Sequence, residues 1–158
     1  MRPIHSGVGG GVVPDAFMVL SRIIASFHNE KGELMIEGLT PTDMQVTELE
    51  ESFLKKMLGS DEINLFDTES ISKRLWLEPA LDVLAIDAPP VKDAVNLVIP
   101  KASAKISLRL PPTEDPEHAM KMLEEHVMKN IPWNASVKFI PNSKAVSYTH
   151  LRAHETCL

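Results

Sequence analysis

Cysteine is almost absent from this sequence, and so are long apolar runs and positively charged clusters. The single cysteine, Cys157, is next to the last of 158 residues, which excludes an internal disulfide framework or a thiolate zinc knuckle. No run of about 18 apolar residues is available to span a bilayer, and the first residues lack the apolar core of a signal peptide. We therefore expect a cytoplasmic protein with no membrane partner.

Aromatic residues make up only 5% of the chain, and the net charge is -6. A nucleic-acid surface needs a basic stripe that displaces counterions, often with stacking rings, so nucleic acid is excluded as a partner. The 44% hydrophobic and 24% charged content is typical of one soluble globular domain with a sizeable core.

A histidine and four glycines come before the first predicted helix, residues 14–27. Pro14 suits the first helical turn. Apolar residues then recur at three- and four-residue spacing, which predicts one buried stripe made of Phe17, Leu20, Ile24 and Phe27. A short extended piece follows at residues 34–36.

A second helix is predicted from a capping box at residues 42–45, which begins with Thr42 and ends with Gln45. Gly59 ends this helix. The residues expected to face inward are Val46, Leu49, Phe53 and Met57. Residues 60–74 have no clean period and are interpreted as a loop with one helical turn.

The pattern then changes to strands, first at residues 81–86 and then in a longer run at 98–110. The longer run alternates apolar and polar residues, so Arg109 should point away from the core. Asp115 and Pro116 mark the start of another helix, which Pro132 stops. A final strand is predicted at residues 135–140.

This order predicts an α+β fold, a two-layer ferredoxin-like β-α-β-β-α-β sandwich with one inserted helix. The first strand of this plan is missing from the front of the element order. We therefore expect a truncated first strand and, as a consequence, a sheet that is split or has one unpaired edge.

Four short motifs occur in a consistent order: HSG at 5–7, PALD at 79–82, NLVIP at 96–100 and AKISLRL at 104–110. Together they resemble the carnosinase, aminoacylase and desuccinylase family of di-zinc peptidases, peptidase family M20, from residue 4 to 140. In that family this region is a lid and dimerisation domain inserted into a larger catalytic domain. The resemblance implies that residues 4–141 are such a domain, from a homodimeric hydrolase that cuts a dipeptide or an N-acyl amino acid.

The resemblance also implies roles for three residues. His5 matches the histidine that reaches the partner subunit's site and stabilises the oxyanion, and Asn96 and Arg109 match residues that bind substrate there. From the residues alone, His5 could be an ordinary loop histidine and Arg109 an exposed strand arginine. The glycines near His5 could cradle a phosphate, but they lack the ending of a P-loop.

The family's zinc ligands are missing here, because no His-x-Asp motif occurs. Glu-Glu pairs at 50–51 and 124–125 are interpreted as solvated helix faces, and His28, His118 and His126 as helix-surface histidines without a role. We therefore expect no cofactor in this chain and no activity on its own, with two zinc ions held by the missing catalytic domain.

The tail at residues 142–158 is predicted to be non-native or disordered. Its string VSYTHLRAHET resembles translated adapter sequence appended to unrelated reading frames, although His150 and His154 could instead be read as zinc ligands. A different class of function also stays open, namely a free-standing ferredoxin-like module in which His5 and Arg109 hold a small carboxylate.

Overall fold

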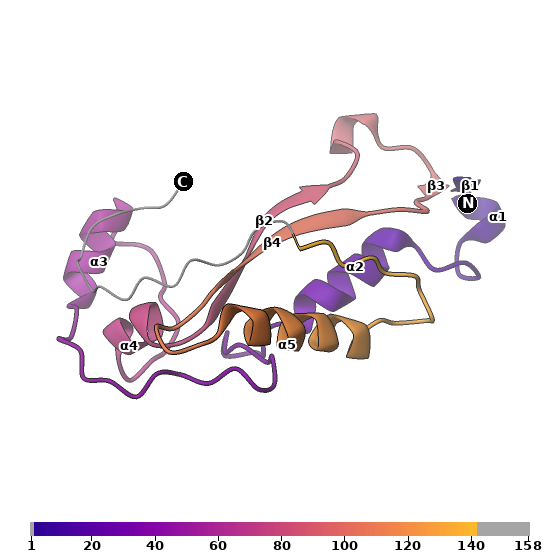
Figure 1. Ribbon diagram of the computed structural model, residues 1–158. Helices are drawn as coiled ribbons and strands as arrows, with labels where there is room; N and C mark the ends of the chain where they lie inside the picture. Colours follow the sequence, from indigo (N-terminus) through magenta and orange to yellow (C-terminus); the bar gives the residue numbers. More distant parts are fainter. Residues whose placement is uncertain (1, 142–158) are drawn as a thin grey trace.

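The computed structural model describes residues 2–141, and the predicted tail at 142–158 lies outside the described residues. The fold is α+β (Figure 1). Within residues 2–141 no helix is long and apolar enough to cross a membrane. In chain order the elements are β1 (Ile4–His5), α1 (Ser6–Gly9), α2 (Ala16–Ala25), α3 (Glu51–Leu58), α4 (Ile71–Trp76), β2 (Ala80–Asp87), the 3-10 turn η1 (Val91–Asp93), β3 (Leu97–Val98), β4 (Ser103–Arg109) and α5 (Pro116–Lys129).

The strands form two separate two-stranded antiparallel sheets, β1 with β3 and β2 with β4. This confirms the prediction of a split sheet. The single strand expected at 98–110 is wrong, because β3 ends at Val98 and β4 begins at Ser103. Pro100 lies in the gap, where its missing N–H and its restriction of Ile99 interrupt a ladder.

Helices α2 and α5 lie side by side beneath the β2–β4 pair (Figure 1). Their apolar stripes meet the inward face of the strands, as the alternation of Ile106 and Leu108 predicts. Each large apolar side chain buried here contributes about 1.5–3 kcal/mol to folding. The buried cluster consists of Val19, Ile23, Phe27, Ile36, Leu81, Leu123 and Val127.

Aspartates begin both of these helices. Asp115 caps α5 by accepting the His118 N–H, with Pro116 in the first turn, as predicted. Helix α2 begins at Ala16 rather than at Pro14, because Asp15 is the residue that caps it. The prediction that Pro14 lies in the first turn of the helix is therefore wrong by two residues.

The helix predicted from Thr42 forms only in its second half, as α3. Thr42 is buried, and its hydroxyl lies 2.6 Å from that of Thr113, so it does not cap a helix. Residues 41–50 have no regular structure. Phe53 and Met57, predicted to be inward, are 51% and 68% exposed, because α3 lies at one end of the molecule, away from α2 and α5 (Figure 1).

The final strand predicted at residues 135–140 is wrong as a strand but right in its alternation. Ala135, Val137 and Phe139 pack against the core, while the residues between them are exposed. No ladder joins this segment to β4 within the described residues, since β4 pairs with β2 alone. The loop expected at 60–74 does contain one short helix, α4, which starts at Ile71.

Candidate functional site

His5 lies at the junction of β1 and α1, at the end of the molecule opposite α3 (Figure 1). Its ring is held by its own helix, because the Gly7 N–H donates to His5 Nδ1 at 3.0 Å. In a neutral imidazole with Nδ1 acting as acceptor, the proton sits on Nε2. In that tautomer Nε2–H is the ring's hydrogen-bond donor, on a residue that is exposed.

Two glycines make this placement possible. A Cβ on Gly9 would lie 2.7 Å from Ile4 Cγ2, closer than side chains pack, and one on Gly7 would lie 3.1 Å from His5 Nδ1. A side chain at position 9 would force Ile4 to move, whereas one at position 7 would need only a small shift of the His5 ring. The close approach of α1 to β1 therefore favours glycine at position 9.

The backbone of Asn96 lies beside His5 and Ser6. The Ser6 N–H donates to the Asn96 carbonyl at 2.9 Å, and the next residue, Leu97, pairs with His5 in the β1–β3 ladder. The Asn96 side chain is exposed. One end of the fold therefore presents a histidine donor and an amide together.

Asp15 fixes this end to the helix layer, and it was not identified as important from sequence. One carboxylate oxygen, Oδ1, accepts the Phe17 and Met18 N–H groups at 2.9 and 3.2 Å. The other, Oδ2, accepts the Ile99 N–H at 2.9 Å. A single side chain thus caps α2 and holds the segment that follows β3, in a way that only the structure reveals.

Arg109 stands apart from His5 and Asn96. It is the last residue of β4, and it donates from Nη2 to the Arg74 carbonyl in α4 at 3.3 Å. Burial lowers the pKa of Arg109, and the nearby Asp82 carboxylate opposes that effect. The guanidinium keeps its charge at neutral pH, because arginine starts from a very high pKa. The structure therefore places Asn96 next to His5, and it places Arg109 at the other end of the β2–β4 pair.

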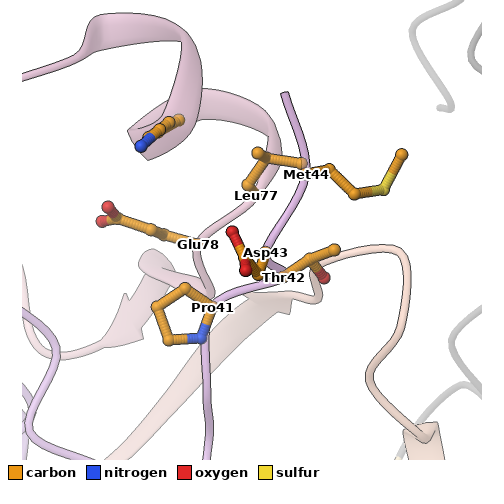
Figure 2. Close-up of a pocket in the computed structure, with 7 residues that line it drawn as sticks. Pro41, Thr42, Asp43, Met44, Leu77 and Glu78 are labelled. Carbon is orange, nitrogen blue, oxygen red and sulfur yellow. The ribbon is translucent and has the colours of Figure 1, made fainter. Parts of the chain in front are cut away.

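A shallow hollow of about 190 Å³ lies near the Arg109 end, between the segment at 41–44 and the end of α4 (Figure 2). Thr42 and Leu77 form its floor, and the Thr42 N–H donates to the Leu77 carbonyl at 2.7 Å. None of the three predicted site residues lines it. The hollow is a by-product of chain packing around Thr42, and we assign it no ligand.

Metal ligands do not gather in the part of the chain that the structure describes, where no three His, Cys, Asp or Glu side chains form a group. The described residues therefore do not fit a zinc ion. The Glu pairs at 50–51 and 124–125 are exposed, as predicted. Glu51 pairs with Lys55 at 2.7 Å and Glu125 with Lys121 at 3.7 Å.

His126 is not the surface histidine that its sequence position suggested. Its ring stacks on Phe27 with centroids 5.4 Å apart, and Nε2 lies 3.0 Å from Ser26 Oγ. The Ser26 hydroxyl donates to the Ile23 carbonyl, so the histidine is the donor to Ser26. Burial lowers the pKa of His126, partly offset by the Ser26 carbonyl. This pair joins α5 to the end of α2 and is not a nucleophile with its base.

A family model described as the peptidase dimerisation domain of M20 peptidases matches residues 2–135. The chain belongs to this M20 dimerisation-domain family, which confirms the resemblance drawn from the ordered motifs.

Similar proteins of known name are dipeptidases. The cysteinylglycine-S-conjugate dipeptidase of Corynebacterium striatum is 36% identical over 140 residues, covering 86% of this chain and 31% of that protein. The Cys-Gly metallodipeptidase DUG1 of Saccharomyces cerevisiae is 28% identical over 134 residues, covering 78% of this chain and 28% of that protein. The chain thus spans less than a third of the length of these two relatives.

Solved structures share the fold. An M20 family metallo-carboxypeptidase from Sulfolobus solfataricus superimposes with a TM-score of 0.66 at 25% identity, over 82% of this chain and 37% of that chain. Human carnosine dipeptidase 1 gives a TM-score of 0.65 at 18% identity, over 81% of this chain and 30% of that one. In both cases the likeness covers most of this chain and a minority of the other.

Proposed function

We propose that this chain is the lid and dimerisation domain of a cytoplasmic zinc-dependent dipeptidase or N-acyl amino-acid amidohydrolase. The family match and the names of the relatives support this proposal. Residues 4–141 would form the domain, and residues 142–158 would be foreign to it. The element order β1, α2, β2, β4, α5 and the extended segment at 135–140 supports a ferredoxin-like β-α-β-β-α-β plan with a short first strand.

In this proposal His5 acts in the active site of a second copy. Its Nε2–H donates to the scissile carbonyl oxygen as that oxygen becomes negative, and Asn96 binds the substrate beside it. The observation that supports this role is the Gly7 N–H bond to Nδ1 of the exposed His5, which leaves Nε2 as the donor of the neutral ring. A fixed donor costs no reorganisation during the reaction, and such a donor contributes about 2.7–4 kcal/mol.

Arg109 would bind a substrate carboxylate through its planar fork. It ends β4, whose seven residues cover about 20 Å at roughly 3.3 Å per residue. A dipeptide is only about 7 Å long. The backbone positions of His5 and Arg109 are thus at different ends of the fold, and we propose that each active site draws on both copies of the dimer.

Zinc would be held by a catalytic domain outside this chain, because the described residues do not group as metal ligands. The chain alone is then inactive. Its own contribution is to pair two copies and to bring fixed hydrogen-bond donors to a site that the other domain builds. The hydrogen-bond donors of this domain act independently of the metal ligands. Their effect can therefore be tested in a relative whose own catalytic domain supplies the zinc.

A domain exchange tests this function. The matching segment of the Corynebacterium striatum dipeptidase is replaced by residues 2–135 of this chain, and hydrolysis of a cysteinylglycine S-conjugate is measured. We expect an active chimera in which His5→Ala lowers kcat about 100- to 1000-fold. His28→Ala is the control, because His28 is an exposed histidine at the far end of α2. Equal activity of the His5→Ala and His28→Ala chimeras would refute the role of His5.

A further inference from the structure

The backbone of Arg74 provides the hydrogen-bond acceptor for Arg109. The Arg74 carbonyl lies near the end of α4, where carbonyls have no partner inside a helix. The Glu78 N–H, which is four residues further on, donates to the Lys73 carbonyl at 3.1 Å instead. Arg109 Nη2 therefore binds, at 3.3 Å, a carbonyl that the helix itself leaves open.

The side chain of Arg74 fixes α4 to two neighbouring loops. Its Nη2 donates to the Gly32 carbonyl at 2.6 Å, and its Nη1 donates to the Asp67 carbonyl at 3.3 Å. The guanidinium also lies over the Phe66 ring, 4.8 Å from the centroid, where a cation is attracted to an aromatic face. A planar guanidinium can make these contacts at once because its donors form a rigid fork. The Arg74 carbonyl that Arg109 binds is therefore fixed by the Arg74 side chain.

The first turn of α4 is held as well. The Glu48 carboxylate accepts the Ile71 N–H at 2.8 Å and the Ser72 N–H at 3.3 Å. Ser72 is fully buried, and its hydroxyl accepts the Leu49 N–H at 2.7 Å. A helix of six residues has little stability of its own. These contacts and those of Arg74 therefore determine where the carbonyls at its end lie.

We propose that Arg74 is a positioning residue for the substrate carboxylate and acts through Arg109. The inference rests on the proposed function, in which Arg109 binds that carboxylate. The Arg74 carbonyl takes only one N–H group of the guanidinium, so the other donors remain for a bidentate bond to a carboxylate. Arg109 is exposed, and an exposed side chain loses rotational freedom when it binds a ligand. Holding it in place beforehand removes part of that cost.

The same hydrogen bond could instead serve only the helix, with Arg109 as a cap on the carbonyls of α4. The two roles differ in their effect on substrate binding. The carboxylate is not the group that reacts, so a contact to it is the same in the ground state and in the transition state. Loss of positioning should therefore raise KM and leave kcat unchanged. Loss of a cap that serves stability alone should change neither.

A double-mutant cycle in the chimeric dipeptidase, with a cysteinylglycine S-conjugate as substrate, tests the inference. We expect Arg74→Gln to raise KM about 10-fold and Arg109→Gln to raise it about 100-fold, with kcat changed less than about twofold in both. In the Arg109→Gln background, Arg74→Gln should have no further effect on KM, because the group that it positions is gone. Arg22→Gln is the matched control and should leave KM unchanged, because Arg22 also lies over an aromatic ring, Trp133 at 5.3 Å, but belongs to α2.

The outcomes separate this inference from the proposed function. An unchanged KM in Arg109→Gln would refute carboxylate binding by Arg109, and the inference with it. If Arg109→Gln raises KM, the role of Arg74 alone is refuted by an unchanged KM in Arg74→Gln, by effects that add in the double variant, or by an equal increase in Arg22→Gln.

NMR of the full wild-type chain gives a second measurement, which decides if the chimera is inactive or if circular dichroism shows that Arg74→Gln does not fold. The hydrogen bond on Nη2 hinders rotation about the Cζ–Nε bond of Arg109. This rotation should therefore be slower for Arg109 than for Arg22. Equal rates would show that the Arg74 carbonyl does not hold the Arg109 guanidinium in place.

Discussion

The Asp15→Ala variant should destabilise the chain more than the loss of an ordinary helix cap, because one carboxylate serves two elements. The cap on α2 is worth about 1 kcal/mol. The bond from the Ile99 N–H adds about 1.5–3 kcal/mol, the range for a hydrogen bond to a charged group. Because the site is partly exposed, water can replace some of these hydrogen bonds in the variant. We therefore expect the free energy of unfolding to fall by about 2–3 kcal/mol.

Asp115→Ala is the matched control, because Asp115 caps α5 through a single bond from His118 and holds no second element. It should cost only about 1 kcal/mol. For a chain of this size each kcal/mol lowers Tm by about 2–4 °C, so the Asp15 variant should melt about 4–12 °C lower. Urea denaturation followed by circular dichroism measures both variants. Equal losses for Asp15→Ala and Asp115→Ala would refute the double role of Asp15.

Three further perturbations probe the fold. Burial lowers the pKa of His126 from 6.5 in the folded chain. The contribution of His126 to the free energy of unfolding is therefore complete above pH 6.5, and it decreases as the pH drops toward the pKa of the folded state. In urea denaturation at several pH values, His126→Phe should make this decrease in stability smaller. Gly9→Ala should speed amide exchange at Ser6, because the new Cβ meets Ile4, and unchanged exchange would contradict that packing. Leu123→Ala should cost about 2–5 kcal/mol, and a smaller loss would show that α5 is not central to the core.

The sequence predicted the elements whose signals are local. Asp115 followed by Pro116 set the start of α5, and the alternation around Ile106 gave the inward face of β4. The family followed from four motifs in order, none of which was sufficient by itself, and the match over residues 2–135 confirms it. Local chemistry and motif order were therefore enough for the class of protein.

The missed features depend on contacts between distant segments. Thr42 resembled a helix cap, but its hydroxyl is used by Thr113, 71 residues away. His126 resembled a surface residue, but its partner Ser26 is 100 residues away. No pattern within a short window contains such information. For the same reason the alternation at 135–140 predicted a strand although no ladder partner lies beside it within the described residues.

Placement of the candidate site followed the same division. The pairing of His5 with Leu97 places Asn96 beside the histidine, which the sequence alone did not predict. The separation of Arg109 from these two residues could not be predicted, because it depends on the contact between the last residue of β4 and Arg74 in α4.

Mixed dimers of the chimeric dipeptidase give the most direct test of action across the dimer. One copy carries His5→Ala with an intact catalytic half, and the other carries intact His5 with an inactivated catalytic half. Each variant alone should be inactive. If His5 serves the partner's site, each mixed dimer should have about half the activity of a dimer with two intact copies, because only one of its two sites is complete. Mixed dimers that form but stay inactive would show that His5 does not act across the dimer.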